Sequence, residues 1–130
     1  MTTLARINLL LVVTLAAHTA DHAFNQPNRH LAAAVVIPGL VGSGVALVSL
    51  ALALLRNPLA APLAVALGFG QAIGFVAVHL LPHWGSFSDP YSPLSLNALS
   101  WVLVVAPIAA ALALGFAGLR TMPRRSAAAA

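Results

Sequence analysis

The stretch INLLLVVTLAAHTADH, residues 7–22, contains the two features that decide the fold of this chain. Its first part, residues 7–17, is almost entirely apolar, and the rest carries two histidines and an aspartate. A helix of about 20 mainly apolar residues spans a bilayer, and residues 4–24 are long enough for that. We therefore expect a transmembrane helix that ends in a polar cluster.

The composition of the whole chain also indicates a membrane protein. Of its 130 residues, 61% are hydrophobic and only 6% are charged, whereas soluble domains carry about 25% charged residues. Three more apolar segments cover residues 31–55, 59–81 and 94–119. We predict an all-α fold, an integral membrane bundle of four transmembrane helices with short loops. It would form one domain over residues 1–125, followed by a disordered Ala-rich tail at 126–130.

The first segment has one alternative interpretation, a cleaved signal peptide. A basic residue followed by a short apolar run is typical of such peptides. However, cleavage after Ala20 would put His18 at a position that requires a small residue, and cleavage after Ala17 would put Leu15 there. We favour retention of this segment as a helix, and cleavage stays open as the alternative.

The arginines predict the orientation of the bundle. Four spans place both termini on one side, together with every arginine except Arg29. The excess of positive charge marks the cytoplasmic side, so we expect a plasma-membrane protein with cytoplasmic N- and C-termini. Trp84, Tyr91 and Trp101 then fall on the outer side as interfacial anchors.

The same charge pattern bears on the partners. The arginines are scattered at segment ends and form no basic stripe, which argues against nucleic acid. The expected partners are the lipid bilayer and other subunits of a membrane complex.

Histidines at the outer ends of two segments predict a metal site. His18 and His22 are four residues apart, which places them on one helix face about 6 Å apart at Cβ, and Asp21 borders that face. His79 and His83 repeat the spacing at the end of the third segment. Imidazole and carboxylate ligands suit zinc, copper(II), iron or nickel. We predict that these five side chains form a metal site at the extracytoplasmic face.

Two conditions decide whether these ligands share one ion. Pro82 disfavours helical geometry at Leu81, so the third helix can end there and leave His83 in a loop. The first and third helices must also meet, because metal–nitrogen bonds of about 2 Å exclude a shared site if His18 and His79 are more than ~10 Å apart. His30 and Asp89 are expected in loops as ordinary interfacial residues.

Other functions stay open. A heme between His18 and His79 is less favoured, because it needs a wide apolar slot. In one alternative, the histidines and Asp21 are structural groups that only brace the bundle. In another, they act in a proton-coupled transporter or pH sensor. The chain has no cysteine and no nucleophile motif, which favours a protein that is not an enzyme.

Small residues predict where the helices pack closely. Gly70 and Gly74 form a small-xxx-small pair in the third segment, and Gly42 belongs to a cluster of small residues in the second. Gln71 lies mid-membrane, so we expect it to form a hydrogen bond to another helix.

Overall fold

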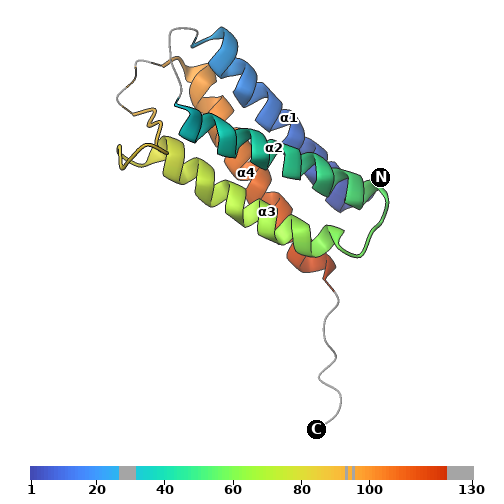
Figure 1. Ribbon diagram of the computed structural model, residues 1–130. Coiled ribbons are helices and arrows are strands. Elements are labelled where there is room, and N and C mark those ends of the chain that lie inside the picture. The colour runs from blue at the N-terminus through green and yellow to red at the C-terminus, as the bar shows by residue number, and fades with distance from the viewer. Residues whose placement is uncertain (27–31, 93, 95, 123–130) are drawn as a thin grey trace.

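A computed structural model of the chain describes residues 1–26, 32–92, 94 and 96–122, and it is all-helical, as the sequence predicts (Figure 1). The helical segments are α1 (Thr3–Phe24), α2 (Ala33–Leu54), α3 (Ala60–Phe75), the π-helical turn η1 (Val76–Leu80) and α4 (Ala98–Thr121). α1, α2, α3 with η1, and α4 are each long and apolar enough to cross a bilayer. The predicted tail at 126–130 and His30 lie outside the described residues.

The fourth helix begins later than residue 94, and its capping residue explains the difference. The side chain of Asn97 accepts a hydrogen bond from the backbone N–H of Ser100 at 2.9 Å. Asparagine is among the best N-cap residues, because its side-chain oxygen satisfies an N–H that has no partner within the helix. α4 therefore begins at Ala98.

Consecutive helices run in opposite directions (Figure 1). The N-terminus, the connection between α2 and α3, and the C-terminal end of α4 lie at one end of the bundle. The opposite end, called here the histidine end, holds the last turn of α1, the turn η1 and the segment from η1 to α4.

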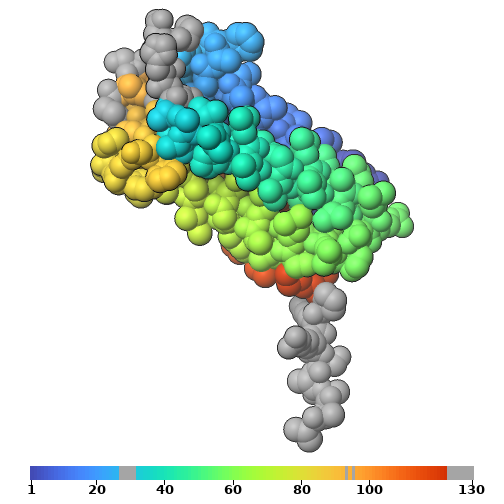
Figure 2. All heavy atoms as spheres, in the orientation of Figure 1, coloured from blue at the N-terminus to red at the C-terminus, as the bar shows by residue number. Residues whose placement is uncertain are grey.

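α4 packs mainly against α1 and α3, whereas α2 is the peripheral helix. α2 and α3 form the face of the molecule seen in Figure 2. Only 11% of the residues in the most apolar part of α2 are buried, against 33% to 39% in the other three spans. The bundle is therefore a three-helix core with α2 laid over one side.

Close contact between α3 and α4 depends on Gly68, Gly115 and Gly118. A Cβ at Gly68 would lie 2.6 Å from the carbonyl oxygen of Ala111 and even closer to the backbone of Gly115. A Cβ at Gly118 would lie 2.8 Å from the side chain of Val65. Small residues at such positions allow helix backbones to approach, which is a main source of attraction between helices in lipid.

None of the glycines singled out in the sequence lies at the contact between α3 and α4. At Gly70 and Gly74, an added Cβ would meet no described atom within 4 Å. Gly42 does lie at a contact, where its missing side chain leaves room for the amide of Gln71. That amide forms no hydrogen bond to any residue that the structure describes.

α1 and α2 are joined by a buried polar pair. The side chains of Asn8 and Ser49 form a 2.6 Å hydrogen bond, and both residues are fully buried. With its amide oriented to satisfy its neighbours, Asn8 accepts this bond and donates to the backbone carbonyl of Ala46. Hydrogen bonds of this kind between membrane helices contribute about 0.6–2 kcal/mol each.

The close approach at Gly68 predicts a contrast between two neighbouring glycines. Gly68→Ala should lower the free energy of unfolding by about 1–3 kcal/mol, because its methyl group forces α3 and α4 apart. Gly70→Ala should leave stability unchanged or raise it by up to about 1 kcal/mol, because alanine is the better helix former. Unfolding of both variants with increasing SDS measures the difference, and equal midpoints would contradict the α3–α4 contact.

Candidate metal centre

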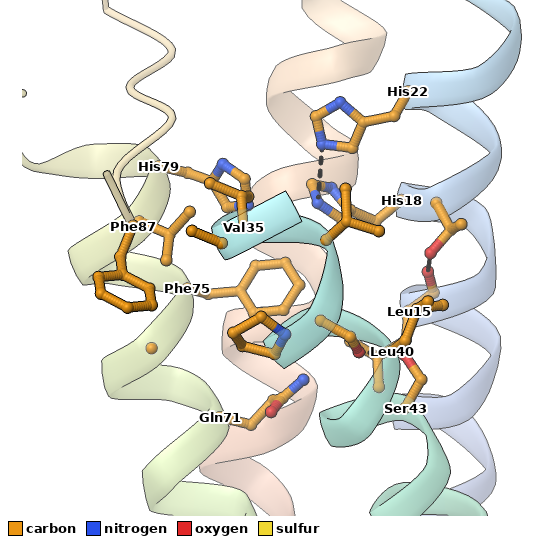
Figure 3. Close-up of a pocket in the computed structure, with 17 residues that line it drawn as sticks. Leu15, His18, His22, Val35, Leu40, Ser43, Gln71, Phe75, His79 and Phe87 are labelled. Carbon is orange, nitrogen blue, oxygen red and sulfur yellow. Dashed lines mark hydrogen bonds between the residues drawn. The ribbon is translucent and has the colours of Figure 1, made fainter. Parts of the chain in front are cut away.

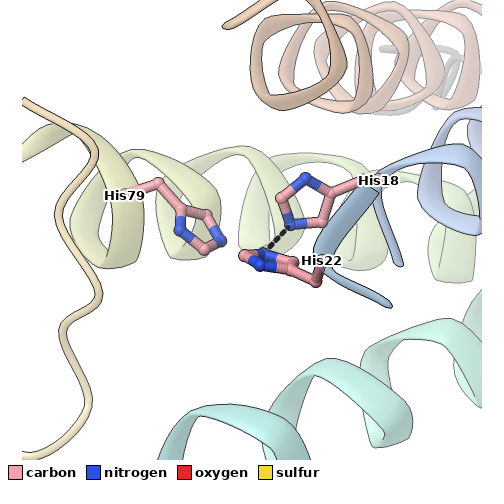
Figure 4. Close-up of side chains that lie close together, drawn as sticks. All are labelled: His18, His22 and His79. Atoms are coloured by element: carbon pink, nitrogen blue, oxygen red, sulfur yellow. Dashed lines mark hydrogen bonds between the residues drawn. The ribbon is translucent and has the colours of Figure 1, made fainter. Parts of the chain in front are cut away.

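Three imidazole rings meet at the histidine end, His18 and His22 from α1 and His79 from η1 (Figure 4). The ring of His18 lies 4.6 Å from that of His22 and 4.9 Å from that of His79, measured between centroids. One ligand nitrogen from each ring can be chosen so that all three lie within 4.8 Å of one another. His18 and His79 are only 6% and 5% exposed. The two helices thus meet as a shared site requires.

The separation of the nitrogens is close to that of a metal site. Two imidazoles on one tetrahedral zinc ion, with metal–nitrogen bonds of about 2.0–2.1 Å, place their ligand nitrogens about 3.3 Å apart. The Nε2 atoms of His18 and His22 are 3.2 Å apart. The longest separation in the group, 4.8 Å, would have to shorten by about 1.5 Å for full tetrahedral coordination.

His79 owes its position to the way the third helix ends. In a π-helical turn each N–H bonds to the carbonyl five residues back. Pro82 has no N–H, so it cannot donate to the carbonyl of Ala77. The last turn widens, and the N–H of Leu81 bonds to the carbonyl of Val76 five residues back, at 3.1 Å. The indole of Trp84 donates to the carbonyl of Ala77 at 2.6 Å and replaces the missing proline donor.

The segment after η1 folds back and satisfies the next two carbonyls. Asp89 N–H donates to the Val78 carbonyl at 2.8 Å, and Tyr91 N–H donates to the His79 carbonyl at 2.9 Å. Backbone groups at a helix end need such partners, because an unpaired polar group is costly away from water. These bonds bring Asp89 and Tyr91 against His79.

Asp89 determines which nitrogen of His79 faces the other rings. Nδ1 of His79 lies 3.2 Å from the backbone carbonyl oxygen of Asp89 and 3.7 Å from its carboxylate. Both oxygens are acceptors, so Nδ1 must carry the proton and Nε2 of the neutral ring keeps its lone pair. Figure 4 shows a ring nitrogen of His79 facing His18 and His22. Metal-binding histidines are commonly oriented in this way by a carbonyl or carboxylate.

Tyr91 belongs to the cluster, although the sequence suggested only an interfacial anchor. It is fully buried, and its hydroxyl lies 3.3 Å from Nε2 of His22 and 3.4 Å from the side-chain nitrogen of Gln26. Its ring lies 5.1 Å from that of His79 and 5.8 Å from that of Trp101. Trp84, by contrast, is 53% exposed. A tyrosine in a Pro- and Ser-rich segment carries no pattern that separates these two environments.

Asp21 is buried beside the histidines, and its hydrogen bonds go to other residues. Its carboxylate accepts hydrogen bonds from Gln26 at 2.6 Å, Asn25 at 2.8 Å and the hydroxyl of Ser100 at 3.0 Å. The last of these bonds joins the end of α1 to the start of α4. Asp21 is not in the group of potential ligands that the structure brings together. Its contacts are those of a residue that braces two helices.

His83 lies in the segment after η1 and is exposed. Its Nδ1 is 3.0 Å from the hydroxyl of Ser88, and it is not in the group formed by the other three histidines. The sequence spacing of four residues does not place His83 beside His79, because Pro82 ends the helix before His83.

A cavity of about 250 Å³ extends from the three rings between α1, α2 and α3 (Figure 3). Its walls are mainly apolar and include Leu15, Val35 and Phe75. The histidines lie at one end, and Gln71 and Ser43 lie at the other. Phe75 lies under the cluster, with its ring 4.9 Å from that of His18.

The donor set fits a transition-metal ion. Nitrogen ligands from imidazole suit zinc and copper(II), and three of them converge without a carboxylate or thiolate among them. Nδ1 of His18 is buried and makes no hydrogen bond among the described residues. The backbone of Leu103 lies near this ring, so a carbonyl acceptor is at hand if Nε2 binds an ion and Nδ1 holds the proton.

Comparison with known proteins gives no independent assignment. Neither the protein-family models, nor the curated proteins, nor the solved structures contain a match to this chain.

Proposed function

We propose that this chain is an integral membrane protein that binds one divalent transition-metal ion through His18, His22 and His79. The convergence of three ligand nitrogens within 4.8 Å carries the proposal. Two of the rings are held on one face of α1, and the third is fixed by the segment that folds back over η1. Side chains already held near the required geometry bind an ion with little loss of conformational freedom.

The charges around the site support a bound cation. Three neutral imidazoles leave a divalent ion with its full charge, which is costly to bury without compensation. The only two acidic residues of the chain, Asp21 and Asp89, lie beside the cluster. The Asp21 carboxylate is linked to Tyr91 through the side-chain amide of Gln26. The Asp89 carboxylate lies 3.7 Å from Nδ1 of His79. Two nearby carboxylates match the charge of one divalent ion.

The donor set and the ring packing favour a single ion over heme. The rings of His18 and His79 meet edge to face at 4.9 Å, which leaves no space between them for a macrocycle. Zinc and copper(II) suit a set of three imidazoles best, with iron as the next choice. We further propose that the site lies at the extracytoplasmic face of the plasma membrane and that both termini are cytoplasmic.

Metal analysis of the purified protein tests the proposal. The wild type should bind about one zinc ion per chain. His18→Ala or His79→Ala should weaken zinc binding by at least ~100-fold, a larger loss than that caused by removing a residue that only hydrogen-bonds to a metal ligand. Affinity should also fall as the pH is lowered, because protons compete for the imidazole nitrogens. Calorimetric titration in detergent, with elemental analysis, measures both effects.

His83→Ala is the matched control, because it removes the same side chain from an exposed position outside the cluster. It should leave zinc affinity within about twofold of the wild type, and Asp21→Asn should keep one ion per chain while reducing stability. If the wild type binds no metal, or if His83→Ala weakens binding as much as His79→Ala, the three-histidine centre is wrong. The histidines would then only brace the bundle.

The orientation has a separate test, which uses the absence of cysteine from the sequence. Ser86→Cys introduces a thiol at the histidine end, and Leu59→Cys introduces one between α2 and α3. A membrane-impermeant maleimide should label intact cells carrying Ser86→Cys and should label Leu59→Cys only after permeabilisation. The reverse pattern would contradict cytoplasmic termini.

A further inference from the structure

We infer that the metal centre keeps one coordination position open toward the cavity. It would bind there a small, largely apolar molecule that supplies one nitrogen or oxygen donor. This inference rests on the proposed metal function. Sites with three protein ligands commonly hold a water or an exogenous ligand in the fourth position. Here all three histidines line the same cavity, so an ion bound between them is reached from it.

The size and walls of the cavity define the class of ligand. An apolar cavity of about 150 Å³ is large enough for benzene, and this one has about 250 Å³. Leu15, Val35, Leu40, Phe75 and Val78 are among the residues that line it. A molecule somewhat larger than benzene would bury its apolar part against these side chains, and its donor atom would bind the ion.

The far end of the cavity offers a second, weaker point of recognition. The Gln71 side chain lines the cavity and makes no hydrogen bond to a described residue. Its amide can therefore donate to, or accept from, a polar group at the other end of a ligand. The Ser43 hydroxyl nearby bonds to the Gly39 carbonyl at 2.9 Å. Neither group is charged, so the cavity favours neutral molecules over ions.

The route into the cavity runs past α2. Pro38 and Gly39 line the cavity, and Gly39 has no described atom within 4 Å of where its Cβ would be. The outward side chains of this part of the helix, such as Ile37 and Val41, are about 60% exposed. In a bilayer this wall faces lipid, so an apolar ligand partitioned in the membrane can enter from the side.

Ligand binding at the ion is a simple exchange. The donor atom shares its lone pair with the metal, the metal–water bond breaks, and the water leaves the site. No electron is transferred, and no proton moves if the donor is neutral.

A pair of probes tests the inference on the full-length protein loaded with Co(II), whose visible spectrum changes with coordination. Imidazole and 4-phenylimidazole carry the same donor, and only the second has an apolar body. 4-Phenylimidazole should bind at least ~10-fold more tightly than imidazole, because its phenyl ring is buried in the cavity.

Two neighbouring glycines supply the variant and its control. Gly74→Leu places a side chain in the cavity, and Gly70→Leu adds the same side chain one turn away, at a position that does not line it. The preference for 4-phenylimidazole should fall to within about twofold in Gly74→Leu and should persist in Gly70→Leu. Because both variants are measured in the same detergent, partitioning of the probe into micelles affects them equally.

The outcomes separate this inference from the proposed function. If Co(II) binds but neither probe changes its spectrum, the open position is absent and only the inference fails. Equal preferences in Gly74→Leu and Gly70→Leu would also overturn it, because the phenyl ring would then lie elsewhere. If the wild type binds no Co(II), the proposed function fails and the inference fails with it.

Discussion

The end of the third helix has to satisfy its backbone carbonyls, and the arrangement of the histidine end depends on how it does so. Within a bilayer, each unsatisfied backbone group costs several kcal/mol. Pro82 removes one donor, so the indole of Trp84 and the N–H groups of Asp89 and Tyr91 bond to three successive carbonyls, those of Ala77, Val78 and His79. The same bonds that complete the helix end also place a carbonyl behind His79 and a hydroxyl beside His22.

This arrangement explains why so much polarity is tolerated at one end of an apolar bundle. Asp21 is fully engaged by donors from its own helix end and from α4, so it braces the two helices while remaining close to the histidines. Tyr91 and Gln26 connect that network to His22. Structural bracing is therefore compatible with the proposed metal binding: the acids and amides hold the backbone, and three imidazoles remain close together beside an apolar cavity.

The sequence predicts the helices well, because long apolar runs separated by proline and polar breaks leave few alternatives. The pairing of His18 with His22 follows from helical spacing, and the expected topology places His79 at the same end of the bundle. Only the packing of α1 against η1 brings the three rings together. The place of His83 depends on a π-turn that local sequence does not reveal, although Pro82 indicates a break. Gly68 rather than Gly70 contacts α4, and helices that are apolar all round give no hydrophobic pattern to show which face is buried. Tyr91 and Asp89 reach the site through backbone bonds of an irregular segment, which no motif encodes.

The central claim is that three imidazoles from two helices bind one ion. X-ray absorption at the zinc edge of the loaded protein tests it most directly, because the spectrum reports the number and kind of ligand atoms. We expect three imidazole nitrogens at about 2.0–2.1 Å, with one further light atom in the remaining position. A spectrum with fewer than three imidazoles, or one dominated by carboxylate and water oxygens, would contradict it.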